Sequence, residues 1–206
     1  MPVTLGLDLD NTLVVYDRLF ERLSVARAWV PNLVASRGKL AIRDYLRTQP
    51  GGEGQWRELQ ALAYGPGMAE AELAPQAAES LDRLAQRGIT LCVVSHKTRT
   101  APLQGRQVDL HASARSFLDA RHLTWEAGGP LASVDFEPTR KGKVRRIAAR
   151  GCTAFVDDLL EVFLEEGFPP SVAQILYQPL GACPADFSGR HVRSWVEVAD
   201  LVLGLA

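Results

Sequence analysis

The chain has 206 residues, of which 47% are hydrophobic and 23% are charged. That composition is ordinary for a globular protein and excludes a disordered tail, a collagen-like rod and a coiled coil. The 23 Lys and Arg residues nearly balance the 24 Asp and Glu residues, and the net charge is −1. A general nucleic-acid binder would normally show a basic excess, so this balance argues against one.

The sequence shows no targeting or membrane segment. The N-terminal residues MPVTLGLDLD lack the basic region and the long apolar region of a signal peptide. No window approaches the roughly 20 apolar residues of a membrane span. The three cysteines, Cys92, Cys152 and Cys183, share no short spacing, and their odd number does not suit a disulfide framework. We therefore expect a cytoplasmic protein without membrane or nucleic-acid partners.

Apolar runs of strand length alternate with helical segments along most of the chain. Strands are predicted at 3–9, 89–94, 133–136, 153–156 and 172–177, and helices at 77–86, 140–149, 159–165 and 195–203. Helix, glycine and strand follow one another three times, with Gly88, Gly151 and Gly167 as the glycines. This alternation predicts an α/β fold with a doubly wound, mainly parallel sheet.

Residues 16–74 interrupt the alternation. They contain no clear strand, but they show helical spacing at 17–30, 33–46 and 56–64 with Pro- and Gly-containing breaks between. We interpret them as a small helical cap inserted after the first strand, which leaves 1–15 and 75–206 as the core domain. Residues 17–47 carry a net charge of +4 and residues 53–82 one of −5. These charges are either solvated helix faces or include arginines that bind a substrate anion.

Polar residues follow three of the predicted strands at the point where each strand ends. Asp8 and Asp10 follow the first strand, Ser95 the second, and Asp157 and Asp158 a later one. Ligands of parallel α/β sheets bind beyond the carboxyl ends of the strands, so we expect these residues to meet at one edge. Each group alone is compatible with an ordinary polar loop. Their combination, with a lysine at the start of the helix at 140–149, is harder to obtain by chance.

In this order, the four motifs resemble those of the haloacid dehalogenase (HAD)-like superfamily. Its DxDx(T/V) motif after an apolar strand matches Asp8-Leu9-Asp10-Asn11-Thr12, and its strand that ends in Ser or Thr matches 91–95. Its lone lysine near a helix start matches Lys143 or Lys141, and its acidic pair matches Asp157-Asp158. The first and fourth motifs are specific together, whereas the second and third are weak alone. The resemblance covers the whole chain and implies a Rossmann-like HAD core with a first-type helical cap.

The resemblance also implies an activity, that of a Mg²⁺-dependent phosphatase (a phosphohydrolase) acting on a small phosphorylated metabolite. Asp8 would attack phosphorus and form an aspartyl-phosphate, which water then hydrolyses. Asp10 would protonate the leaving group first and take a proton from water second. Dehalogenases and transport ATPases of this superfamily lack an acid at the position of Asp10, whereas phosphatases and phosphomutases have it.

The same resemblance assigns the Mg²⁺ ligands and the groups that contact phosphate. The ligands are the Asp8 carboxylate, the Asp10 backbone carbonyl and the Asp157/Asp158 pair, with Asp158 favoured for direct contact and Asp157 through water. The absence of any His or Cys cluster with zinc spacing also favours a hard ion. Ser95 would donate to a phosphoryl oxygen, and Lys143, with Lys141 as the alternative, would neutralise charge in the transition state.

The segment after Ser95 is predicted to be a long, ordered loop, because the next helix begins only near Asp109. Its residues His96, Lys97 and Arg99 are candidate ligands of a substrate anion, with a solvated loop as the alternative. Asn11 and Thr12 of the first motif are also candidate substrate-binding residues.

Two other functions are compatible with these residues. A phosphomutase of the same superfamily would keep all of them. A non-catalytic, phosphate-binding regulatory protein would keep the fold but would not need a general acid such as Asp10.

Overall fold

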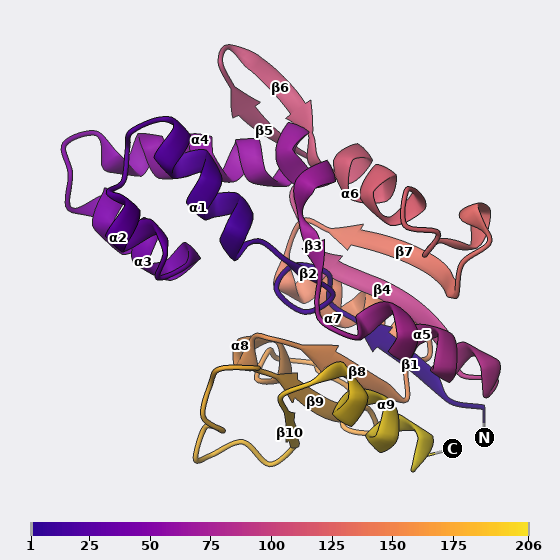
Figure 1. Cartoon of the computed structure of the whole chain (residues 1–206). Helices are drawn as coiled ribbons and strands as arrows, with labels where there is room; N and C mark the ends of the chain where they lie inside the picture. Colours follow the sequence, from indigo (N-terminus) through magenta and orange to yellow (C-terminus); the bar gives the residue numbers. More distant parts are fainter. Residues whose placement is uncertain (1, 206) are drawn as a thin grey trace. The chain divides into compact units, whose positions relative to one another are not determined.

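A computed structural model describes residues 2–205, which divide into two compact units (Figure 1). The first unit comprises the described residues of Met1–Val14, Leu73–Thr98 and Leu118–Ala206. The second comprises Val15–Glu72 and Arg99–Phe117. The chain passes from one unit to the other at four points. Two of them lie in the paired short strands β2 (Val14–Val15) and β3 (Glu72–Leu73), one lies after Thr98, and one lies within α6 (Leu110–Asp119).

The first unit is built on a six-stranded parallel sheet with the strand order β10-β9-β8-β1-β4-β7. This sheet confirms the α/β fold that the sequence predicts. All five predicted strands are present, although β1 is shorter than expected, and the three-residue β10 was not predicted. The strands are β1 (Thr4–Leu7), β4 (Thr90–His96), β7 (Leu131–Glu137), β8 (Ala154–Asp157), β9 (Ala173–Tyr177) and β10 (Arg190–Val192).

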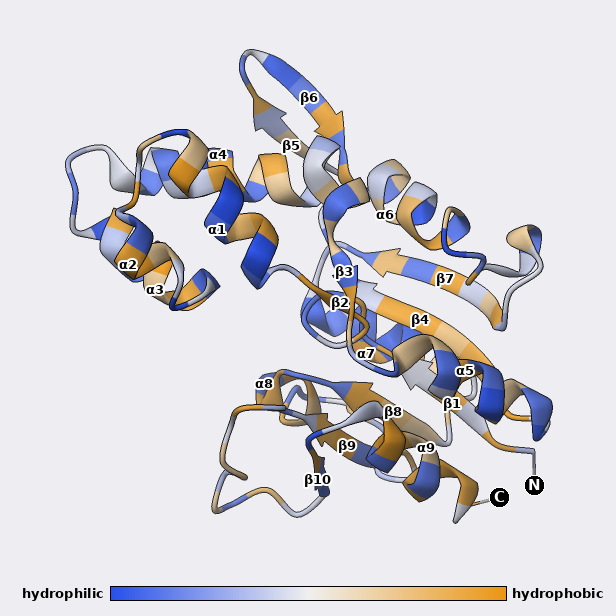
Figure 2. Cartoon of the chain, in the orientation of Figure 1, coloured by the Kyte–Doolittle hydropathy of each residue, from blue (hydrophilic) through white to orange (hydrophobic). Residues whose placement is uncertain are grey.

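Helices cover both faces of this sheet. On one face lie α5 (Ala77–Gln86) and α9 (Trp195–Leu203), which pack against each other, and on the other lie α7 (Arg140–Ala149) and α8 (Leu160–Phe163) (Figure 1). The central strands are apolar along most of their length (Figure 2). Their side chains alternate between the two faces, so that Cys92 and Val94 of β4 pack with Ile147 of α7. The sheet is therefore buried on both faces, as parallel sheets usually are.

Gly6 in β1 is the position where the core approaches this strand most closely. A Cβ atom there would lie 2.4 Å from the Phe155 ring and 2.8 Å from Cys152 Sγ. The thiols of Cys92 and Cys152 are free, and their sulfur atoms lie 3.7 Å apart. Because side chains alternate along a strand, Asp8 projects to the same side of the sheet as Gly6 and Phe155.

The second unit contains α1 (Asp17–Ala26), α2 (Asn32–Ala35), α3 (Lys39–Arg47) and α4 (Gly52–Tyr64). The continuous helices predicted at 17–30 and 33–46 are wrong, because the chain turns at Ala28, with φ 53°, and at Gly38, with φ 89°. The Phe20 ring packs against Trp56 and Tyr64 at centroid distances of 5.4 and 5.8 Å. Among the described residues of both units, no helix is long and apolar enough to cross a membrane.

The predicted loop after Ser95 is also wrong, because much of it is a β-hairpin of β5 (Thr100–Leu103) and β6 (Arg106–Asp109). Its two turn residues, Gln104 and Gly105, have φ values of 49° and 76°. Positive φ at both central residues is typical of the type I′ turn, which matches the twist of paired strands. The hairpin belongs to the second unit, and α6 begins directly after it.

Candidate active site

The loop after β1 holds Asp8 and Asp10 in a tightly bonded backbone. Asp8 N donates to Val156 O at 2.9 Å, which extends the β1–β8 ladder to the carboxylate-bearing residue. Asn11 then adopts φ 62° and donates its N–H to Val14 O at 2.8 Å. The indole of the buried Trp195 donates to Thr12 O at 3.0 Å. These bonds fix the direction in which both carboxylates leave the backbone.

Lys143 lies in the first turn of α7, where the Thr139 side chain caps the helix by accepting from Gly142 N at 2.9 Å. Its fully buried ammonium donates to Asp8 Oδ1 at 2.5 Å and to Asp157 Oδ2 at 2.6 Å. Burial lowers the pKa of Lys143, but the two carboxylates outweigh this effect and raise it above its ordinary value. The alternative candidate, Lys141, is exposed and pairs with Glu166 at 3.4 Å. The structure therefore brings Lys143, and not Lys141, to the acidic residues.

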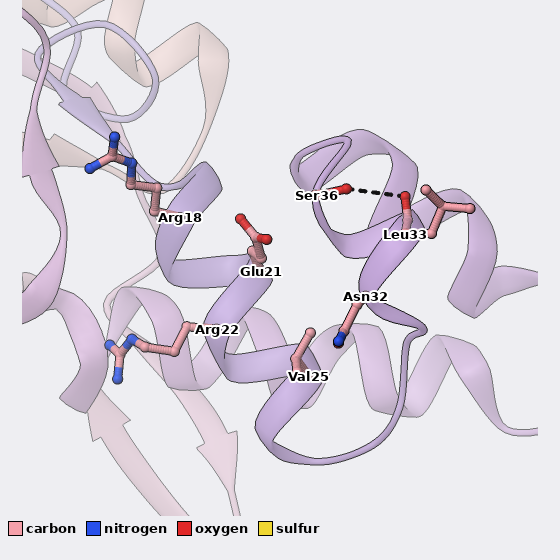
Figure 3. A pocket seen from close by; sticks show the side chains of 7 residues that line it. All are labelled: Arg18, Glu21, Arg22, Val25, Asn32, Leu33 and Ser36. Atoms are coloured by element: carbon pink, nitrogen blue, oxygen red, sulfur yellow. Dashed lines mark hydrogen bonds between the residues drawn. The ribbon is translucent and has the colours of Figure 1, made fainter.

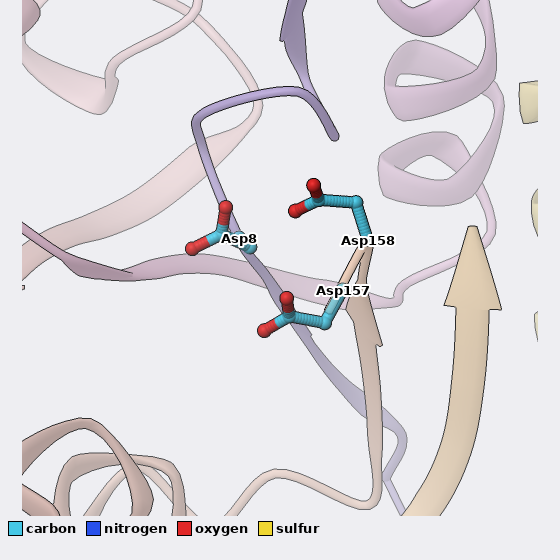
Figure 4. A group of neighbouring side chains, drawn as sticks. All are labelled: Asp8, Asp157 and Asp158. Atoms are coloured by element: carbon cyan, nitrogen blue, oxygen red, sulfur yellow. The ribbon is translucent and has the colours of Figure 1, made fainter. Parts of the chain in front are cut away.

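Asp157 is the last residue of β8, Asp158 follows it, and both lie beside Asp8 (Figure 4). One carboxylate oxygen from each of the three residues lies within 4.8 Å of the others. Asp157 is fully buried, and this burial raises the pKa of Asp157 to about 7 against the opposing effect of Lys143. Its Oδ1 accepts from Leu159 N at 3.0 Å, so both of its oxygens have donors.

Asn11 and Thr12, the predicted substrate contacts of the first motif, lie against Asp158. Asn11 Nδ2 is 3.4 Å from Asp158 Oδ2, and the Thr12 hydroxyl is 3.4 Å from Asp158 Oδ1. Gln178, after β9, donates to the Asp158 backbone carbonyl at 3.3 Å. Nothing in the sequence pattern distinguishes Gln178 from other polar loop residues, so its place beside Asp158 has no sequence signal.

Ser95, His96 and Lys97, at the end of β4 and directly after it, differ in burial and in their contacts. The Ser95 hydroxyl is buried and has no hydrogen-bond partner among residues 2–205. Lys97 is also buried, and its ammonium donates to Asp10 Oδ2 at 2.6 Å. His96 lies between them in the strand, is exposed, and has its Nε2 3.2 Å from Pro138 O. The sequence suggests Lys97 as a substrate contact, whereas its contact with Asp10 joins residues 87 positions apart and leaves no local sequence signal.

Arg99 belongs to the second unit. Its Nε lies 3.6 Å from Asp109 Oδ2 at the open end of the hairpin. A surface hollow within the second unit is lined by α1 and α2 and contains Arg18 and Arg22 (Figure 3). Both arginines form ion pairs, with Glu72 and Glu70 respectively. None of the predicted site residues lines this hollow.

No protein-family model and no curated protein matches the sequence. Solved structures do match it. A HAD family hydrolase from Deinococcus radiodurans R1, with bound phosphate and sodium, is 14% identical, with a TM-score of 0.60 over 98% of this chain and 96% of that chain. YfnB from Bacillus subtilis, bound to magnesium, is 12% identical, with a TM-score of 0.59 over 98% of both chains.

A dehalogenase is 15% identical, with a TM-score of 0.58 over 97% of this chain and 96% of that chain. At such low identities a structural likeness speaks for the fold alone. The likeness covers nearly the whole length of each protein and agrees with the parallel sheet described above. The chain therefore has the fold of the HAD-superfamily hydrolases.

Proposed function

We propose that the protein is a Mg²⁺-dependent phosphohydrolase that acts on a small phosphorylated metabolite. This proposal rests on one observation: Asp8, Lys143 and the Asp157/Asp158 pair lie close together at the ends of β1 and β8. A phosphoryl group can approach a carboxylate only where cations and hydrogen-bond donors offset the repulsion. The phosphate in the Deinococcus structure and the magnesium in YfnB, both of which share the fold, support this chemistry.

Asp8 is the proposed nucleophile, and Asp10 is the proposed acid and base. A carboxylate oxygen of Asp8 attacks phosphorus, the bond from phosphorus to the leaving oxygen breaks, and Asp10 gives its proton to that oxygen. Asp10 then takes a proton from water, whose oxygen attacks the aspartyl-phosphate and releases phosphate and free Asp8. Lys143, which is held against Asp8, offsets the negative charge on the phosphoryl oxygens in both steps.

The buried hydroxyl of Ser95 supports a phosphoryl ligand at the end of β4. A buried polar group without a partner costs roughly 1–3 kcal/mol, so such groups normally have a hydrogen-bond partner. Ser95 has none among the described residues, and β4 lies directly beside β1, which leads to Asp8. A phosphoryl oxygen bound there would accept the hydrogen bond that the protein itself does not provide.

The carboxylates of Asp8, Asp157 and Asp158 suit a hard divalent cation. Mg²⁺ prefers oxygen ligands and keeps several waters, and these three residues offer clustered oxygens. Both Asp157 oxygens accept short hydrogen bonds, at 2.6 and 3.0 Å, whereas those to the Asp158 oxygens are 3.4 Å long. We therefore assign the direct contact to Asp158 and the water-mediated one to Asp157. The Asp8 carboxylate and the Asp10 carbonyl complete the proposed ligands. Bound Mg²⁺ would neutralise charge and orient the phosphoryl group.

The test is the hydrolysis of p-nitrophenyl phosphate with Mg²⁺ and with EDTA, followed by a panel of phosphorylated sugars, nucleotides and small acids. Mg²⁺-dependent release of phosphate is the expected result. Interconversion of sugar monophosphates without net phosphate release would identify a phosphomutase instead. Binding of phosphate without turnover of any compound would identify a non-catalytic phosphate-binding protein and refute the proposal. His96 and Arg99 remain predicted substrate contacts, to be tested on the compound that the panel identifies.

A further inference from the structure

One strand end delivers two buried polar side chains to the candidate site. Ser95 and Lys97 are two residues apart and buried, whereas His96 between them is exposed. This is the alternation of an extended chain, in which every second side chain lies on the same side. Lys97 N donates to Glu137 O at 2.9 Å, so the β4–β7 pairing continues one residue beyond the end of β4. The backbone that carries Lys97 is therefore held by the sheet.

The partner of Lys97 is the proposed acid and base. The Lys97 ammonium lies 2.6 Å from Asp10 Oδ2, and its side chain is only 3% exposed, against 20% for Asp10. A lysine is rarely buried to this extent without a charged partner, because the ammonium loses its hydration. Here the carboxylate of Asp10 replaces part of that hydration. The contact between Lys97 and Asp10 is therefore a largely buried ion pair within the first unit and not an exposed, mobile one.

Backbone contacts hold the loop at Asp10, but they do not determine how the Asp10 carboxylate is oriented. The backbone of Asp10 pairs with that of Val14, and Asn11 N donates to Val14 O, so the loop backbone is held by these contacts. The side chain of Asp10 still has rotatable bonds and is partly exposed. Because Lys97 is anchored on a different strand, its ammonium restricts the rotation of the carboxylate.

We propose that Lys97 is a positioning residue, which holds the Asp10 carboxyl group where the leaving oxygen departs and water later enters. This inference rests on the proposed phosphohydrolase function. It gives the two buried lysines separate tasks, since Lys143 contacts Asp8 and Lys97 contacts Asp10. It also replaces the expectation that Lys97 contacts the substrate directly. A group displaced by about 1 Å from its reacting position can lose about a hundredfold in rate.

The experiment compares two leaving groups in wild-type protein and in Lys97→Met, with Arg87→Met as an exposed-cation control. p-Nitrophenolate leaves without needing a proton, whereas the alkoxide of an alkyl phosphate needs one from Asp10. We expect Lys97→Met to lower kcat/KM for the alkyl phosphate about tenfold more than kcat/KM for p-nitrophenyl phosphate, because this ratio does not include hydrolysis of the intermediate that both substrates share. In an Asp10→Ala background the same substitution should have almost no further effect, because its target is gone.

Other outcomes would overturn the inference. An equal loss on both substrates would indicate a merely structural role, and a rise in KM with unchanged kcat would indicate direct substrate contact. If Lys97→Met does not fold, Lys97→Gln, whose side chain is uncharged and one bond shorter and so loses the 2.6 Å contact with Asp10, is measured in the same way. The same fold-change on both substrates would again refute the inference. A wild-type protein that hydrolyses neither compound, nor any in the panel, would refute the proposed function itself, which is a distinct result.

Discussion

The ammonium nitrogen of Lys143 lies 2.5 Å from Oδ1 of Asp8, and the same nitrogen lies 2.6 Å from Oδ2 of Asp157. One buried cation is therefore shared by two buried carboxylates, and a third carboxylate, that of Asp158, lies close by. The cluster carries more negative than positive charge in the absence of a metal. Its stability and its proposed activity depend on the same few side chains.

Lys143→Met should both inactivate the protein and destabilise it. Removal of the ammonium leaves Asp8 and Asp157 buried together without a counter-charge, and the loss of one partner of a buried ion pair typically costs about 3–5 kcal/mol. Denaturant unfolding of the metal-free protein measures this change. Added Mg²⁺ should restore part of the lost stability, because it would bind the same carboxylates. Lys141→Met is the matched control and should change stability by no more than about 0.5 kcal/mol, because Lys141 is exposed. Equal unfolding free energies for the two variants would contradict the assigned role of Lys143.

Asp8→Asn should abolish phosphate release while it preserves the fold. An amide is not a nucleophile of this kind, but its oxygen can still accept the hydrogen bond from Lys143. The substitution also removes one of the two charges that share this lysine, so the metal-free variant should be at least as stable as wild type. Steady-state phosphate release and thermal unfolding check the two expectations. A variant that keeps a substantial fraction of wild-type kcat would rule out the covalent mechanism on Asp8.

Asp158→Ala should raise the Mg²⁺ concentration that gives half-maximal activity by about tenfold or more, because it removes the proposed direct ligand. EDTA should inactivate the wild-type protein, and excess Mg²⁺ should restore it. Glu161→Ala, which removes an exposed acid on nearby α8, is the control and should leave the Mg²⁺ requirement unchanged. A crystal structure with Mg²⁺ bound away from Asp8 and Asp158 would refute the assignment, whatever the kinetic result.

The sequence predicts much of the first unit because its signals are local. The bounds of α5, α7 and α9 agree with the predicted ranges, since Gly88 and Gly151 turn the chain after α5 and α7, and Thr139 and Ser194 cap α7 and α9. The second unit is predicted less well, because Ala28 is neither glycine nor proline and because the apolar spacing of a helix continues across the break at Gly38. The hairpin after Arg99 did have a signal, Gly105 in a two-residue turn, but Pro102 and the many charged residues around it obscure the strand pattern.

The candidate site shows the same division between local and long-range information. The carboxylates and Ser95 lie in the last residues of strands or just beyond them, and the ends of the predicted strands indicate them. The choice between Lys143 and Lys141 depends on which side of α7 faces β8, and the pairing of Lys97 with Asp10 depends on how far β4 extends along β7. Both are set by contacts between segments that lie far apart in the sequence. The apolar face formed by residues 144–148 favours Lys143, but no pattern within one segment pairs Lys97 with Asp10.

Gly6→Ala is the last prediction and concerns the strand that supports Asp8. The added Cβ would lie 2.4 Å from the Phe155 ring, within a closely packed core where neither group has space to move. Overpacking of this kind costs about 1–3 kcal/mol, and β1 would have to shift away from β8, which displaces Asp8 from Lys143. We therefore expect lower unfolding free energy and lower kcat together. Gly54→Ala is the matched control, because nothing lies within 4 Å of a Cβ at this exposed position in α4. It should stabilise the protein by roughly 0.5–1 kcal/mol through helix propensity, without an effect on kcat. A Gly6→Ala variant as stable and as active as wild type would show that the core around β1 adapts to the extra methyl group, and that the position of Asp8 does not depend on this packing.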